Sequence, residues 1–112
     1  MKTNDRFLGL LGIAFRAGRL VLGADAAGRA TEERKTRLLL LSEGLSRHTA
    51  GTLRVRAEQN GVKVVSIRRT MDELESALGK HTGVIAVTDA GFAKALLALC
   101  AKENEEESIY AD

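Results

Sequence analysis

The sequence predicts an α/β fold, a three-layer α-β-α sandwich with a four-stranded mixed sheet. Stretches with helical periodicity alternate along the chain with short stretches that are apolar at nearly every position. Short, continuous apolar runs are typical of strands that helices cover on both faces. The connections between these stretches are tight, and 112 residues suffice for one domain with a substantial core.

The first half of the chain predicts two helices and two strands. Residues 6–17 place their large apolar side chains on one helical stripe, and Gly18 fits the position that ends the helix. A strand over 20–22 leads into a helix over about 24–34, which should bury small residues against the sheet. The four leucines of residues 38–41 predict a central strand.

The second half repeats the alternation of helices and strands. Ser46 is the expected N-cap of a helix over 47–60, and a β-branched strand covers 62–67. A capping box at Thr70 begins a short helix, and a buried strand follows over 84–88. A final helix follows, and its side chains facing the core should be Phe92, Ala95, Leu96 and Leu99.

Positive charge is concentrated in the body of the chain. All 17 Lys and Arg lie within residues 1–102 together with ten Asp and Glu, so this part carries a net charge of +7. Residues 103–112 carry the other five acids. We expect one domain over 1–102 and an acidic, disordered tail over 103–112. A basic body suits a polyanion such as RNA, whereas an aromatic content of 4% argues against base-stacking platforms.

The composition and the motifs argue against an enzyme, a metal or cofactor site and a membrane protein. Cys100 is the single cysteine and is expected to be a buried thiol, and zinc would lack its usual set of ligands. Gly18 and Gly23 have the spacing of a phosphate-binding loop, but Ala24 and Asp25 replace its Lys and its Ser or Thr. The apolar runs are far shorter than a membrane span. We expect a cytoplasmic monomer.

Two polar residues of types that enzymes use are better explained as helix caps. Asp89 follows a buried strand, where α/β enzymes often place a catalytic carboxylate, but the sequence offers it no evident partner base. Ser46 precedes a helix, although a pairing with His48 is conceivable. We interpret Ser46 as an N-cap, and we expect Asp89 or its neighbour Thr88 to cap the final helix.

The stretch from Gly18 to Arg29 is the expected contact site for an anionic partner, which we take to be RNA. A short strand runs through Gly23 into a helix, and the helix start offers backbone N–H groups and a positive dipole. His81, in a later loop, is open to two interpretations: an exposed loop residue, or a contact to the RNA backbone. Basic residues near element ends should form a common surface around the turn: Arg16, Arg19, Arg29, Lys35, Arg37, Arg47 and Lys80.

Five short segments carry a resemblance to a known family. They are Leu10-Leu11-Gly12, Arg16-Ala17-Gly18-Arg19-Leu20-Val21 with Gly23, Leu38-Leu39-Leu40-Leu41-Ser42-Glu43, Leu78-Gly79-Lys80 and Val87-Thr88-Asp89-Ala90-Gly91-Phe92-Ala93-Lys94. In this order and spacing, over nearly all of residues 6–100, they resemble the kink-turn-binding ribosomal protein superfamily, which has the Pelota-type RNA-binding fold. The chain is especially similar to the bacterial YlxQ-like branch of that superfamily.

The resemblance implies an RNA surface made of the turn after the first strand, the start of the next helix and two nearby loops. In the superfamily the turn reads Gly, a variable residue, Asn, Glu, two more residues and Lys, and its Asn, Glu and Lys contact sheared G·A pairs in kinked RNA. Here Gly23 and the variable Ala24 match, and Arg29 keeps the cation. Asp25 replaces the Asn and Ala26 replaces the Glu. Losing two base contacts of ~1–3 kcal/mol each would erase preference for a standard kink-turn, whereas backbone contacts would survive.

The same resemblance implies that Glu43 lies in the second loop of the surface, and Lys80 and His81 in the third. Phosphates would be held by Arg16, Arg19, Arg37 and Lys80. We therefore expect a non-enzymatic protein that binds ribosomal or kinked RNA in association with ribosomes or translation. The alternative is a protein-interaction adaptor that has kept the fold and lost kink-turn specificity, which Asp25, Ala26 and the acidic tail favour.

Overall fold

A four-stranded mixed sheet forms the middle layer of the molecule. In this computed structural model, which describes the backbone of residues 5–111 and side chains through residue 103, the strand order is β1-β4-β2-β3. The strands are β1 (Leu20–Leu22), β2 (Leu38–Ser42), β3 (Val64–Ile67) and β4 (Val84–Val87). Strand β4 is antiparallel to β1 and to β2, whereas β2 and β3 are parallel. The predicted α-β-α sandwich with a mixed sheet is confirmed.

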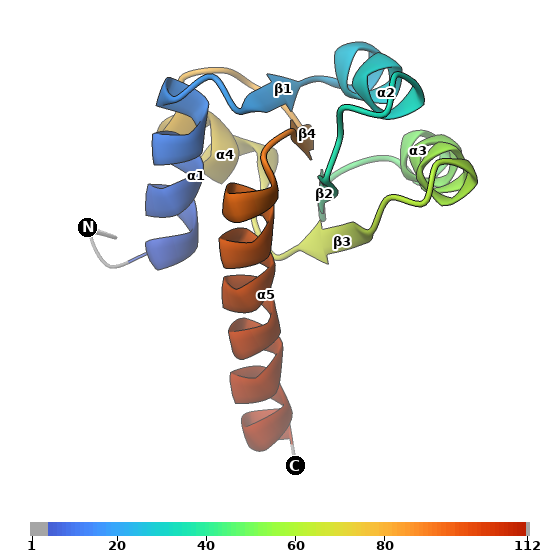
Figure 1. The fold of residues 1–112 in the computed structure, drawn as a ribbon. Coiled ribbons are helices and arrows are strands. Elements are labelled where there is room, and N and C mark those ends of the chain that lie inside the picture. Colours follow the sequence, from blue (N-terminus) through green and yellow to red (C-terminus); the bar gives the residue numbers. More distant parts are fainter. Residues whose placement is uncertain (1–4, 112) are drawn as a thin grey trace.

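Helices cover both faces of the sheet (Figure 1). One face carries α1 (Arg6–Arg16), α4 (Met71–Leu78) and α5 (Ala90–Ala111). The other face carries α2 (Ala24–Glu32) and α3 (Arg47–Gln59). None of the helices in the described part of the chain is both long and apolar enough to cross a membrane.

Strand β2 joins the two halves of the core. Leu38 and Leu40 pack on the face of α1, α4 and α5, and Leu39 and Leu41 pack on the face of α2 and α3. All four leucines are buried, because the strand lies between β4 and β3 and has helices on both sides. The four consecutive leucines are therefore explained by burial of both faces of the strand, as the sequence indicated.

The predicted helix caps are present. The hydroxyl of Ser46 accepts a hydrogen bond from the Thr49 N–H at 3.2 Å, and Thr70 forms a complete capping box with Glu73. A carboxylate oxygen of Asp89 accepts from the Phe92 N–H at 2.9 Å, as an N-cap does. Ser46 and Asp89 thus serve as the helix caps that the sequence favoured.

Strand β3 and helix α5 differ in length from their predicted counterparts. Strand β3 begins at Val64 rather than 62, because the Val62 N–H bonds to the Ala57 carbonyl and closes the end of α3 instead. Helix α5 continues to Ala111, past the expected end of the domain at 102. The side chains of residues 104–112 lie outside the described part, so the disordered state expected for this acidic segment stays a prediction.

Arg69, in the loop between β3 and α4, ties three distant parts of the chain together. Its guanidinium donates two hydrogen bonds of 3.0 Å to Asp5 and two, of 2.6 and 3.4 Å, to Glu103, and it lies 5.3 Å from the centre of the Phe7 ring. Burial alone would raise the pKa of Asp5, but the bonds from Arg69 and from the Leu8 N–H lower it below the usual value. Glu103, expected at the start of the tail, is part of this anchor.

Cys100 is a buried thiol, as expected. Burial, and next the negative charge of Glu103, raise its pKa to about 11, so it is protonated at neutral pH. A protonated, buried thiol is a poor nucleophile, which fits a structural residue.

Candidate nucleic-acid interface

The strand directions sort the connecting segments into two groups at opposite ends of the sheet. We call the first group the turn end: it contains residues 23–25, 43–46, 68–70 and 79–83, where β1, β2 and β3 finish and β4 begins. We call the second group the basic end: it contains residues 16–19, 33–37, 60–63 and 88–89. Backbone hydrogen bonds hold each group together, for example Gly23 N–H to the Val84 carbonyl at 2.9 Å and Arg37 N–H to the Val87 carbonyl at 2.7 Å.

The Gly23 turn lies at the turn end and begins α2. Gly23 has φ 101° and ψ 149°, a backbone conformation that favours glycine, and no side chain caps the helix. The Ala27 N–H makes the first helical bond, to the Gly23 carbonyl, so the earlier N–H groups have no carbonyl one turn before them. Together with the helix dipole, they form a positive pole that can bind an anion.

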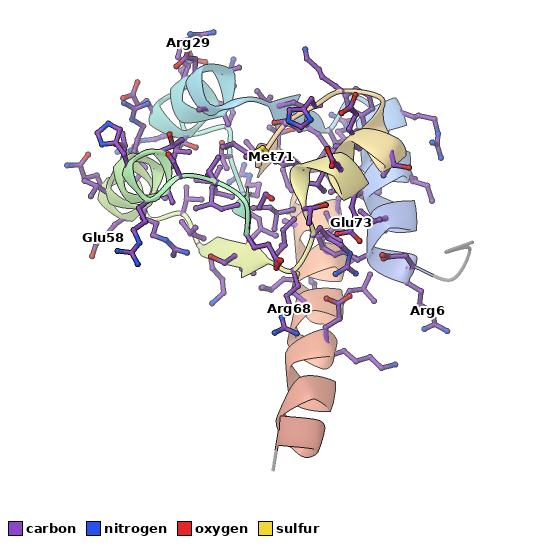
Figure 2. All side chains as sticks on the ribbon, turned by 180° about the vertical axis from the view of Figure 1, so that it is seen from behind. Arg6, Arg29, Glu58, Arg68, Met71 and Glu73 are labelled. Carbon is purple, nitrogen blue, oxygen red and sulfur yellow. The ribbon has the colours of Figure 1, made fainter. Side chains whose placement is uncertain are left out.

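The exposed face of α2 carries two charged side chains close to the Gly23 turn. Asp25 and Arg29 lie one turn apart and are both exposed, whereas Ala27 and Gly28 are buried against the rest of the protein. Figure 2 shows Arg29 on the outer side of α2, pointing away from the body. A partner that reaches the Gly23 turn would therefore meet Asp25 and Arg29 as well.

Gly28 leaves room for the side chain of Arg56, which comes from α3. A Cβ atom at Gly28 would lie 2.3 Å from a guanidinium nitrogen of Arg56, which crosses over the helix and pairs with Glu32 at 3.0 Å. Sequence reasoning did not foresee this role for Arg56, because nothing in the sequence shows that α2 and α3 are neighbours.

Glu43, Lys80 and His81 also lie at the turn end, and all three are exposed. The segment that leads into β4 carries Lys80 and His81 and lies between the other two loops, because β4 lies between β1 and β2. The sequence-based grouping of Gly23, Asp25, Glu43, Lys80 and His81 is therefore matched by their placement. Their contact with RNA stays a prediction.

Arg16, Arg19 and Arg37 lie elsewhere, at the basic end. Arg19 precedes β1 and Gly23 follows it, and four residue steps in a strand span about 13 Å. The expected common basic surface around Gly23 is thus divided in two. The order of the strands decides this division, because Arg16 and Arg19 lie before β1, and Arg37 lies before β2, which runs parallel to β1.

The turn end is not predominantly basic. Exposed acids lie there in the loops and in the first halves of α2 and α4, and those in the first turns (Asp25, Asp72 and Glu73) complement the helix dipoles. The exposed acids are Asp25, Glu43, Asp72, Glu73 and Glu75. Arg47, Arg68 and Lys80 are exposed cations in the same region. Anion binding here therefore depends on backbone N–H groups and on individual cations rather than on a broad positive field.

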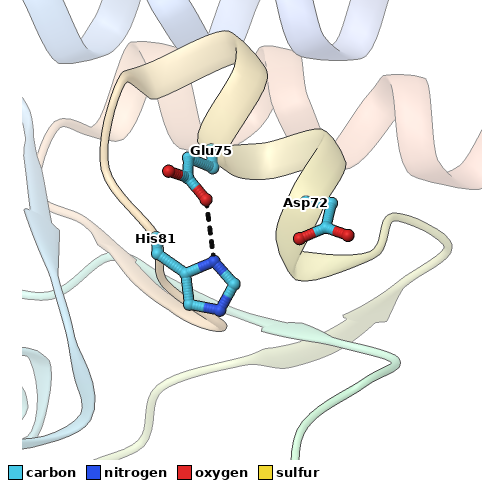
Figure 3. A group of neighbouring side chains, drawn as sticks. All are labelled: Asp72, Glu75 and His81. Atoms are coloured by element: carbon cyan, nitrogen blue, oxygen red, sulfur yellow. Dashed lines mark hydrogen bonds and ion pairs between the residues drawn. The ribbon is translucent and has the colours of Figure 1, made fainter.

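Asp72, Glu75 and His81 form the one group of possible metal ligands that the described residues contain (Figure 3). Their ligand atoms lie within 4.8 Å of one another, and Nδ1 of His81 lies 2.9 Å from a carboxylate oxygen of Glu75. One imidazole and two carboxylates could hold a transition-metal ion, but all three side chains are exposed, and such groups are common without an ion. This group could not be recognised in the sequence, because Gly79, with φ 75°, reverses the chain between Glu75 and His81.

Fold and site together define a small α-β-α sandwich protein with an uncapped, glycine-led helix start exposed at one end of its sheet. The chain is 33% identical over 95 residues to the RNA-binding protein YlxQ of Bacillus subtilis (strain 168), covering 80% of this chain and 90% of that protein. The chain belongs to the YlxQ family. A solved structure of a protein with unknown function from Bacillus halodurans C has a TM-score of 0.83 and 32% identity, over 88% of this chain and 99% of that one. No family profile matches the chain.

Proposed function

We propose that this protein binds structured RNA through its turn end and is not an enzyme. The observation that carries the proposal is the start of α2 at Gly23, where no side chain caps the backbone N–H groups at the positive end of the helix dipole, and Arg29 lies one turn beyond Asp25 on the exposed face of the same helix. The family supports the choice of RNA, since the curated relative is named as an RNA-binding protein. We place the protein in the cytoplasm, as a monomer associated with ribosomes or translation.

Each group at the turn end has a part in this proposal. The N–H groups of the first turn of α2 bind a phosphate, and Arg29 and Lys80 add positive charge on either side. Asp25 and Glu43 are acceptors only, so they suit the amino groups of exposed bases. We infer that the protein binds a kinked or looped ribosomal RNA without the full set of contacts that selects a standard kink-turn.

Substitution of Arg29 tests this proposal. We expect Arg29→Ala to weaken binding to a kink-turn RNA or a folded ribosomal-RNA fragment and to reduce the slope of log affinity against log salt by about 1. Arg6→Ala is the matched control, because Arg6 is exposed near the start of α1 and lies far from Arg29 (Figure 2). Binding that is undetectable or insensitive to salt across a panel of folded RNAs would contradict the proposal.

The acidic residues at the turn end favour a second candidate, a protein-interaction adaptor. Five exposed acids lie at or beside this surface, with Ala26 at the position where the superfamily has a base-reading carboxylate. An adaptor would keep its protein partner after nuclease treatment of a pull-down, and a bulky substitution such as Ala26→Tyr would release that partner. Loss of all partners with nuclease favours RNA.

A further inference from the structure

The basic end gathers most of its charge from three loops that are far apart in the sequence. Its exposed cations are Arg16, Arg19, Arg34, Lys35, Arg37 and Lys63. Two acids lie in these loops: Glu33 pairs with Lys35 at 3.1 Å, and Asp89 caps α5. Two more lie in the adjoining last helix turns: Glu32, which pairs with Arg56 at 3.0 Å, and Glu58. The loops of the basic end therefore carry an excess of positive charge, in contrast to the turn end.

The sheet fixes the positions of two of these arginines. Leu20 of β1 and Leu38 of β2 both pair with Val87 of β4, from its two sides. Arg19 and Arg37 directly precede these leucines, so their backbones lie at the same level and about 10 Å apart, two strand spacings. Backbone bonds hold both: the Thr88 N–H donates to the Arg19 carbonyl at 2.9 Å, and the Arg37 N–H donates to the Val87 carbonyl.

Arg34 has an unusual backbone conformation at this end. It is the one residue other than glycine with a positive φ, 64°, in the described part of the chain. Helices α1, α2 and α3 all end here with the same pair of backbone hydrogen bonds, and the left-handed position is held by Gly18 in α1, Arg34 in α2 and Gly61 in α3. Glycine adopts this conformation without strain and arginine does not, so an arginine there points to a use for its side chain.

The negative poles of helices α1, α2 and α3 explain only part of this charge. Each helix end is equivalent to about half a negative charge and stabilises cations within its last turn. Arg16 lies in the last turn of α1 and fits that explanation. Three other cations lie beyond the helices, just before strands: Arg19, Arg37 and Lys63. The helix dipoles therefore do not account for the presence of these cations.

We infer that the basic end is a second RNA-binding surface, which holds the phosphate backbone of an RNA double helix separately from the turn end. This inference rests on the proposed function and extends it: one RNA segment meets the Gly23 turn, and another lies against Arg19, Arg34 and Arg37. Phosphate contacts need no particular sequence, so this surface recognises a regular duplex, whereas the turn end requires exposed bases. The protein thereby holds two segments of a folded RNA at opposite ends of its sheet.

A plain 20-base-pair RNA duplex is the probe for the basic end. The double variant Arg19→Gln/Arg37→Gln should weaken duplex binding about tenfold near 100 mM salt and reduce the salt slope by about 2, whereas Arg29→Ala should leave duplex binding unchanged. Arg6→Gln is the charge-matched control on a distant surface. Duplex binding that is unaffected by the double variant, while the protein still binds a looped RNA through Arg29, would overturn this inference and leave the proposed function standing. Absence of binding to every RNA would overturn both.

Arg34→Gly separates a binding role from a structural one. Glycine fits the left-handed position, so the variant should unfold at the same temperature as the parent protein or a higher one, and it should bind the duplex about threefold more weakly. A variant with unchanged duplex affinity would show that Arg34 does not contact the duplex.

Discussion

Arg69 shows how a single side chain can position a whole group of elements. Only 12% of its side chain is exposed, and it joins the start of α1, the loop before α4 and the last described side chain of α5. Asp5 and Glu103 remain partly exposed, so water offsets part of the cost of burying these charges. The anchor therefore combines moderate stability with a fixed geometry.

Removal of the Arg69 charge should destabilise the protein. Arg69→Met keeps an apolar stem against Phe7 but leaves two carboxylates without their cation, so we expect the free energy of unfolding to fall by about 2 kcal/mol in urea titrations. Arg6→Met, at an exposed site, should change it by less than about 0.5 kcal/mol. Equal effects of the two substitutions would contradict the anchor.

The lowered pKa of Asp5 predicts a loss of stability in acid. Its contribution is complete above the ordinary Asp value of 3.8 and is lost as pH falls through the lower value of the folded state. Asp5→Asn keeps a residue that can cap α1 and removes the charge. The stability difference between parent and variant should be constant above about pH 5 and should shrink toward pH 2, where a persistent difference would exclude this linkage.

At the scale of elements, the turn end depends on close packing around Gly83. A Cβ atom there would lie 2.7 Å from the terminal methyl of Met71 and 3.0 Å from a methyl of Leu45. Gly83 is buried beside the first residue of β4, so the loop after β2 and the start of α4 meet over it. The shape of the candidate RNA surface is thus set partly by a residue that cannot itself contact RNA.

Gly83→Ala should be destabilising for this reason. The added methyl group must displace the ends of the Met71 and Leu45 side chains, which are flexible, so we expect a cost of up to about 1 kcal/mol of unfolding free energy. Gly51→Ala is the matched control, because Gly51 is exposed in α3 with no atom within 4 Å of its Cβ position. That control should be neutral or stabilising by up to about 1 kcal/mol, since alanine favours the helix. Chemical denaturation of both variants measures the difference.

At the scale of the whole molecule, one sheet joins two packed cores and separates the two ends that carry the candidate RNA surfaces. Leu39 and Leu40 are adjacent in β2 but face opposite cores. The same strand leads from the basic end, at Arg37, to the turn end, at Glu43. Loss of packing on either face should therefore reach both ends.

Leu39→Ala and Leu40→Ala test this coupling. Each should lower the free energy of unfolding by about 3 kcal/mol, because both side chains are fully buried. Unfolding should remain one transition in both variants, with circular dichroism and Cys100 accessibility changing together. Two separate transitions would show that the two cores unfold independently.

Local patterns in the sequence suffice to predict the helices and strands and their order along the chain. The leucine run of β2, the helix end at Gly18, the capping box at Thr70 and the N-cap at Asp89 all follow from local periodicity and local hydrogen bonds. Local signals of this kind act over a few residues, so they can be recognised without knowledge of the fold. The placement of Gly23 before an uncapped helix was determined in the same way.

Which of these elements come together depends on the packing of the whole chain. Strand β4 lies between β1 and β2 and is antiparallel to both. This arrangement places Glu43, Lys80 and His81 at the same end of the sheet as Gly23. It places Arg16, Arg19 and Arg37 at the opposite end. The anchor at Arg69 joins residues up to 64 positions apart in the sequence. Strand order and such long-range pairs depend on which buried faces pack together in three dimensions, and no local pattern in the sequence records that packing.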